Sequence, residues 1–251
     1  MSATALRARG VSEIVDAAFA LYRRDGMQYI TLAAILTAPS IVLNLMLTGG
    51  ASPTSMFDFA RLLPAMVLAW ITYALVSGAI IRMGSNAYLG THSDVAATVR
   101  EVLPQVPTLI GAIILSSFMI AISAVFLFFP VFYVVSLLFA TVPVIVLERK
   151  GVFAAISRSS QLSKGLKWHI LGTLALVYGI YFVLSLGIPL LAALIGNAVI
   201  QFVIQSVFAI LAAPILNLVV MVLYYDARIR SEGFDVEHMA RGLDAPQYAP
   251  Q

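Results

Sequence analysis

Basic side chains that could bind an anion recur in the short polar stretches of this chain. Each lysine or arginine near an anionic bilayer surface contributes about 1 kcal/mol of attraction. The pattern predicts a surface for lipid headgroups or for a partner protein. The alternative is that these residues only anchor the chain and set its topology. The set consists of Arg23, Arg24, Arg149, Lys150, Arg158, Lys164 and Lys167.

A second group of charged residues follows the last apolar run and alternates in sign. Opposite charges four residues apart on a helix lie close enough to pair. We therefore expect a short, ion-paired extension of the last helix, ended by the glycine at position 233. Its members are Asp226, Arg228, Arg230, Glu232 and Asp235.

Residues for catalysis or metal binding are sparse. His92, His169 and His238 are far apart and lack the spacing of a zinc site, and the chain has no cysteine. No nucleophile elbow, phosphate-binding loop or dinucleotide fingerprint occurs. We expect no enzyme activity, no metal and no cofactor. The net charge of +3 sits at the ends of apolar runs, which favours a membrane surface over nucleic acid.

Uncharged polar residues and prolines interrupt the apolar runs. The polar groups either hydrogen-bond between helices or line a site around Gln201, Gln205 and Asn217. The prolines kink helices, either for packing alone or to form a cavity or hinge. The polar residues are Asn44, Thr72, Ser77, Ser116, Ser117, Ser123, Gln201, Gln205 and Asn217, and the prolines are Pro39, Pro143, Pro189 and Pro214.

The composition requires these residues to be held by membrane helices. Hydrophobic residues make up 61% of the chain and charged residues 11%, against about 25% charged in soluble domains. A helix needs about 20 apolar residues to cross a bilayer. Turns are expected at Phe129-Pro130 and Gly196-Asn197. The sequence predicts an all-α polytopic membrane protein with spans over residues 27–48, 62–83, 107–128, 131–147, 168–195 and 199–225.

An amphipathic segment precedes each pair of spans, over residues 11–25, 93–106 and 151–165. In the first, Ile14, Ala18 and Leu21 share one face, opposite Glu13 and Arg23. Such helices lie in the membrane interface or pack on protein. The N-terminal stretch lacks the apolar core of a cleavable signal peptide.

The three segments align without gaps, so the chain reads as three parallel repeats of one surface helix and one hairpin. The alternative is that any such units in an apolar chain look alike. Of the fifteen lysines and arginines, only Arg61 lies in a loop on the far side. The positive-inside bias predicts a cell membrane protein with both termini cytoplasmic. Residues 1–237 form a single membrane domain, and residues 238–251 a disordered tail.

Several motifs together carry a family resemblance. They are Tyr224-Tyr225-Asp226-Ala227-Arg228, Glu148 with Gly151, Arg158-Ser159, Gly165-Leu166-Lys167-Trp168 and the opening Val11-Ser12-Glu13-Ile14. They resemble the prokaryotic membrane-domain family that accompanies some glycerophosphodiester phosphodiesterases, together with its stand-alone six-span relatives. Ser160 departs from the aromatic residue common after Arg-Ser. The catalytic barrel is absent, so the resemblance implies a six-span domain and no phosphodiesterase residues.

The sequence therefore predicts a non-enzymatic membrane module that associates with lipids, another membrane protein or a second copy of itself. The alternative is a small transporter or permease-like subunit for an apolar or amphipathic solute, suggested by the repeat and the prolines. An enzyme acting on lipid is disfavoured, since the spans hold no paired carboxylates or nucleophile–base sets.

Overall fold

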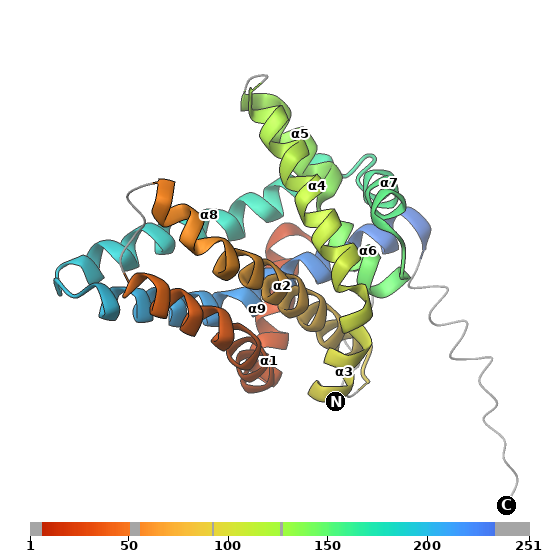
Figure 1. Ribbon diagram of the computed structural model, residues 1–251. Coiled ribbons are helices and arrows are strands. Elements are labelled where there is room, and N and C mark those ends of the chain that lie inside the picture. The colour runs from red at the N-terminus through yellow and green to blue at the C-terminus, as the bar shows by residue number, and fades with distance from the viewer. Residues whose placement is uncertain (1–6, 51–55, 92, 126–127, 234–251) are drawn as a thin grey trace, which may run out of the picture.

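A computed structural model of the protein (Figure 1) describes residues 7–50, 56–91, 93–125 and 128–233, which are helical and without strands. Six stretches are long and apolar enough to cross a membrane: Val11–Thr48, Leu62–Tyr88, Val95–Val125, Pro130–Glu148, Lys167–Ala193 and Ala198–Glu232. The predicted all-α, multi-pass membrane protein is confirmed. Asp235 and the tail predicted over residues 238–251 lie outside the described residues.

The helices follow the predicted order of surface segments and spans. α1 covers a surface segment and a span in one helix, but its backbone leaves helical geometry at Asp25 (φ −120°, ψ 17°), at the predicted junction. The turn expected at Gly196-Asn197 is confirmed, since it joins α8 to α9. The elements are α1 (Val11–Thr48), α2 (Met56–Tyr88), α3 (Val95–Val102), η1 (Leu103–Gln105), α4 (Val106–Val125), α5 (Phe128–Leu138), α6 (Thr141–Glu148), α7 (Val152–Leu162), α8 (Lys167–Ala193) and α9 (Ala198–Glu232).

The hairpins do not all run in one direction. α1 packs on α2 and α9, and α9 packs on α8, so these four helices form one bundle. The α4–α5 hairpin projects away from this bundle at an angle (Figure 1). Charged residues gather where α2, α6 and α9 end and α3 and α7 lie. We call this the basic end, marked by Arg82, Arg149, Arg158 and Arg230.

The buried core lies toward the basic end. Gly84 of α2 faces Leu218 of α9 so closely that a Cβ atom would lie 2.5 Å from the leucine Cδ2. Any larger residue at this position would force the Leu218 side chain to shift. Farther along the helices large apolar residues are exposed, such as Phe182 (61%) and Leu190 (72%), as suits contact with lipid chains. The largest fully buried side chains include Ile80, Leu109, Ile145, Met221 and Tyr224.

The amphipathic segments bury their apolar faces inside the protein. Ile14 and Ala18 of α1 are fully buried and Leu21 is 5% exposed. Ala155 and Leu162 of α7 are buried likewise. These apolar faces pack on other helices of the protein, which is one of the two arrangements that an amphipathic pattern allows.

The turn predicted at Phe129-Pro130 is wrong. α4 ends at Val125, and α5 already begins at Phe128, so both residues belong to the first turn of α5. Proline is tolerated there because the first N–H groups of a helix have no partner within the helix.

The span predicted over residues 131–147 corresponds to the apolar stretch Pro130–Glu148, which consists of two helices. α5 ends at Leu138 and α6 begins at Thr141. Pro143 explains the break, since its ring excludes the carbonyl of Phe139 from the position that a continuous helix requires.

Ser159 of α7 satisfies the backbone groups that this break releases. Its hydroxyl accepts a hydrogen bond from the Ala140 N–H (3.0 Å) and donates one to the Leu137 carbonyl (2.6 Å). Thr141 Oγ1 donates to the Leu138 carbonyl at 2.8 Å. Ser159 is fully buried, so water does not replace it. A break inside a membrane protein is stable only with such partners.

Ser159→Ala should lower the free energy of unfolding by about 1–3 kcal/mol, because it leaves the buried Ala140 N–H without an acceptor. The measurement is denaturant-induced unfolding of the purified protein in detergent. Ser157→Ala is the matched control, since Ser157 is exposed on the same helix and should change stability little. Equal effects of the two substitutions would contradict the role assigned to Ser159.

Candidate functional site

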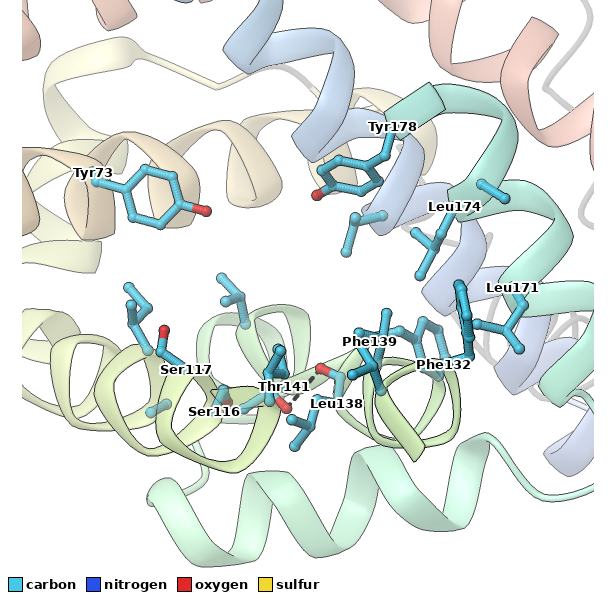
Figure 2. A pocket seen from close by; sticks show the side chains of 18 residues that line it. Tyr73, Ser116, Ser117, Phe132, Leu138, Phe139, Thr141, Leu171, Leu174 and Tyr178 are labelled. Atoms are coloured by element: carbon cyan, nitrogen blue, oxygen red, sulfur yellow. Dashed lines mark hydrogen bonds between the residues drawn. The ribbon is translucent and has the colours of Figure 1, made fainter. Parts of the chain in front are cut away.

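A cavity of about 520 Å³ lies between the α4–α5 hairpin and the main bundle. α2, α4, α5, α6, α8 and α9 all contribute to its walls, and we call it the cleft. Its apolar wall includes Phe132, Leu138, Phe139, Leu171 and Leu174, drawn in Figure 2. The cleft follows from the fold, because the α4–α5 hairpin diverges from α8 and leaves this space between them.

Hydroxyl groups interrupt the apolar wall of the cleft. The phenol groups of Tyr73 in α2 and Tyr178 in α8 point into the same space (Figure 2). Ser116 and Ser117 of α4 line the opposite side. Thr141 also lines the cleft, but its hydroxyl already donates a hydrogen bond to the Leu138 carbonyl.

Four of these hydroxyls are open to a ligand. Within the described residues, the side chains of Tyr73, Tyr178, Ser116 and Ser117 have no hydrogen bond to another protein group. Tyr73 is 57% exposed and Tyr178 45%, so the cleft is open to its surroundings. A polar group in apolar surroundings without a partner costs free energy, and a ligand with its own polar group would remove that cost.

A second cavity of about 400 Å³ lies between α1, α2 and α9 and shares Tyr73 with the cleft. Its polar lining comes from residues such as Asn44, Thr72 and Ser77. Thr72 Oγ1 donates to Ser40 Oγ at 3.5 Å, whereas Ser77 Oγ is buried without a partner among the described residues. Part of the polar set noted in the sequence therefore lines cavities.

Gln201, Gln205 and Asn217, which the sequence suggested as a polar lining, do not form one site. Asn217 donates from Nδ2 to the Ala213 carbonyl of its own helix at 2.8 Å. Gln205 is exposed, Gln201 is half-buried, and neither lines the two cavities just described. Tyr73 and Tyr178 did not stand out in the sequence, because aromatic residues are common in spans. The two tyrosines also lie 105 positions apart, so nothing in the sequence links them.

Most of the predicted basic surface is engaged in pairs. Arg158 contacts Glu148 at 3.1 Å and also pairs with Glu232. Glu148 in turn pairs with Lys150 at 2.9 Å and accepts a hydrogen bond from Tyr224 Oη at 3.0 Å. This network joins α6, α7 and α9. The hydrogen bond to Glu232 and, after it, those to Glu148 raise the pKa of Arg158, although burial opposes the shift.

The other predicted basic residues form either ion pairs, a cation–π contact or no ion pair with the described residues. Arg149 pairs with Glu101 at 2.9 Å, and Arg24 with Asp25 at 2.8 Å. The Lys167 ammonium lies 3.9 Å from the centre of the Tyr133 ring, a cation–π contact. Two others, Arg23 and Lys164, are exposed and have no ion pair with the described residues.

The predicted ion-paired extension of the last helix is confirmed. Arg228 pairs with Glu232 at 3.1 Å and Arg230 with Asp226 at 2.8 Å, each four residues apart. α9 ends at Glu232, followed by Gly233 in a left-handed conformation (φ 65°). Asp235, the remaining member of this set, lies outside the described residues.

Asp226 also contacts two segments that are far from it in the sequence. Its side chain is 1% exposed and accepts a hydrogen bond from the Arg9 backbone N–H at 2.6 Å. His169 Nε2 of α8 lies 3.1 Å from the same carboxylate. Sequence reasoning missed the contact between His169 and Asp226, because 57 residues separate the two side chains.

The described residues hold no group of three or more histidine, aspartate or glutamate side chains that could bind a metal ion. The carboxylates of the basic end face arginine, lysine and histidine partners. The arrangement offers two kinds of groups that could contact a ligand: hydroxyl groups in an apolar cleft, and charges at one end of the bundle.

Comparison with known proteins finds a family to which part of the chain is similar. Residues 104–228 match the family model of the membrane domain of glycerophosphoryl diester phosphodiesterase. These residues run from η1 to the ion-paired end of α9 and include the break, the cleft walls from α4 to α9, and Arg158. No curated protein and no solved structure matches the chain.

Arg158→Leu should lower the free energy of unfolding by about 1–2 kcal/mol, because Glu148 and Glu232 lose a shared, largely buried partner. Lys164→Leu removes the same charge from an exposed position without ion pairs and should have little effect. Arg158→Lys should recover only part of the loss, since lysine lacks the planar fork. Thermal unfolding in detergent measures all three, and equal losses for Arg158→Leu and Lys164→Leu would refute the network's role.

Proposed function

We propose that this chain is a non-enzymatic module that binds an amphipathic lipid, in keeping with the similarity of residues 104–228 to the membrane domain of glycerophosphoryl diester phosphodiesterase. The cleft is the proposed binding site. The observation that carries the proposal is the set of unpartnered hydroxyls in the apolar wall of an open cleft.

The position of the cleft supports a lipid as its occupant. Tyr73, Ser116 and Tyr178 lie well inside stretches that are long and apolar enough to cross a membrane. At that depth the surroundings are lipid chains rather than water. An acyl chain fits the apolar wall, whereas an ester or hydroxyl group would satisfy the open hydroxyls.

The size of the cleft is also suitable. Small-molecule sites occupy about 300–1,000 Å³ and combine apolar walls with few polar groups. The cleft, with about 520 Å³, falls within this range and would hold part of one lipid molecule. Its open side allows the remainder of the lipid to stay in the bilayer.

The orientation of the module follows from its charges. We propose that the basic end faces the cytoplasm in the cell membrane, because lysine and arginine accumulate in cytoplasmic loops. The lipid and partner surfaces suggested by the sequence would then meet the anionic inner leaflet. The ion pairs make Arg158 a structural residue in this proposal, and the exposed Arg23 and Lys164 more available to lipid.

A transporter for an amphipathic solute is a second candidate, favoured by one observation. The break between α5 and α6 lines the cleft, since Leu138, Phe139 and Thr141 all belong to its wall. Transporter sites often lie at interrupted helices between repeats. The two candidates differ because a transporter moves its ligand across the membrane, whereas a binding module retains it.

Tyr73→Phe combined with Tyr178→Phe should weaken lipid binding roughly 30-fold, because two hydrogen bonds of about 1 kcal/mol each are lost. Lipid retained by the protein is measured by mass spectrometry after extraction in polymer nanodiscs and transfer to detergent. Tyr181→Phe is the matched control, since Tyr181 lies on α8 but lines a different cavity.

Unchanged lipid retention in the double variant would overturn the role of the cleft. In a parallel experiment, proteoliposomes report whether fluorescent lipid crosses the bilayer. Flux that depends on Tyr73 and Tyr178 would replace the binding module with the transporter. Retention without flux would support the binding module.

A further inference from the structure

A recess of about 420 Å³ lies at the basic end, away from the cleft, between α3, the start of α4 and the chain that joins α6 to α7. Its lining includes three cations, Arg100, Arg149 and Lys150, and one carboxylate, Glu101. Arg100 was not among the basic residues singled out in the sequence.

The recess contains more positive than negative side chains. Glu101 pairs with Arg149 at 2.9 Å and with Arg82 at 2.8 Å. Lys150 pairs with Glu148 at 2.9 Å, but Glu148 also forms an ion pair with Arg158. Arg100 is exposed and has no ion pair with the described residues. Each carboxylate here is shared between two or more cations, so the recess keeps a positive charge.

The backbone adds to this positive charge. Gly151, which lines the recess, is the N-cap of the 11-residue helix α7 and provides no side-chain hydrogen bond to its first N–H groups. Free N–H groups at a helix N-terminus attract anions. The recess thus combines a helix N-terminus with three cationic side chains.

Arg149 is held in a conformation that an arginine rarely adopts. Its backbone is left-handed (φ 54°), and the structure describes no other non-glycine residue with a positive φ. This conformation is unfavourable for a non-glycine residue, because its Cβ atom crowds the backbone. Glycine would suit the turn from α6 to α7 better, whereas arginine adds a guanidinium group beside Lys150 and Gly151.

The recess lies next to the apolar part of the protein, at the basic end of two of the helices that line the cleft. Thr108 of α4 and Ile145 of α6 line the recess, and one helical turn farther in, Ala112 and Thr141 line the cleft. The recess therefore lies where these two helices reach the basic end, beside the apolar part of the protein. Phosphate groups of a bilayer lie at this boundary.

We propose that this recess binds the phosphate group of an anionic phospholipid, through Arg100, Lys150, Arg149 and the N-terminus of α7. The binding residues differ from those of the cleft, so either site can fail alone. Arginine and lysine bind phosphate through charge-assisted hydrogen bonds, which are about twice as strong as neutral ones.

The test uses the purified full chain in a neutral detergent, where no charged bilayer surface contributes. Native mass spectrometry counts bound short-chain phosphatidylglycerol and phosphatidylcholine, and glycerol 3-phosphate is the soluble probe. The wild type should prefer phosphatidylglycerol. Arg100→Gln and Lys150→Gln should each weaken its binding about tenfold, since one charge-assisted hydrogen bond is lost.

Two control variants remove the same charge outside the recess. Arg23→Gln and Lys164→Gln should leave phosphatidylglycerol binding unchanged, because both residues are exposed and do not line the recess. Losses equal to those of Arg100→Gln would mean general attraction by the basic end and would overturn the site. Tyr73→Phe with Tyr178→Phe should preserve the preference for phosphatidylglycerol, which separates this site from the cleft.

Arg149→Gly distinguishes binding from folding. Glycine adopts the left-handed turn without strain, which offsets part of the stability lost with the ion pair to Glu101. The thermal stability should therefore fall little, while phosphatidylglycerol binding decreases. Binding that survives in all three recess variants would refute the proposal. Equal affinity for glycerol 3-phosphate and phosphatidylglycerol would refute a lipid as the ligand and assign a soluble phosphate ester.

Discussion

The fold depends on how one broken span satisfies its backbone. Pro143 prevents a continuous helix, and the free groups at the break must find partners because lipid offers none. Ser159 provides them from α7, with hydrogen bonds to Ala140 and Leu137. The α4–α5 hairpin diverges from the bundle at an angle (Figure 1). The cleft is the space that this divergence opens.

The residue beside Ser159 fixes α7 from its other side. Arg158 pairs with Glu148 at the end of α6 and with Glu232 at the end of α9. Adjacent residues on one short helix therefore hold the break and join three elements at the basic end. This explains why the Arg-Ser pair carried part of the family resemblance although neither residue lies in the cleft.

The spans could be predicted because length and hydrophobicity alone decide whether a helix can cross a membrane. The end of α9 was also predictable, since Gly233 and charge pairs four residues apart are local signals. Pro143 indicated a kink in this span, but a complete break at Phe139 and Ala140 was not predicted, because the run stays apolar across it. The cleft was missed because Tyr73, Ser116 and Tyr178 come from three helices, and a helical pattern does not tell which helices meet. The amphipathic pattern of α1 likewise left open whether Ile14 and Ala18 face lipid or protein.

α6 reaches both proposed sites. With eight residues, it is about 12 Å long. Its first residue, Thr141, lines the cleft, and the residue after its end, Arg149, lines the recess. No residue lines both sites, so each can lose its ligand while the other keeps it.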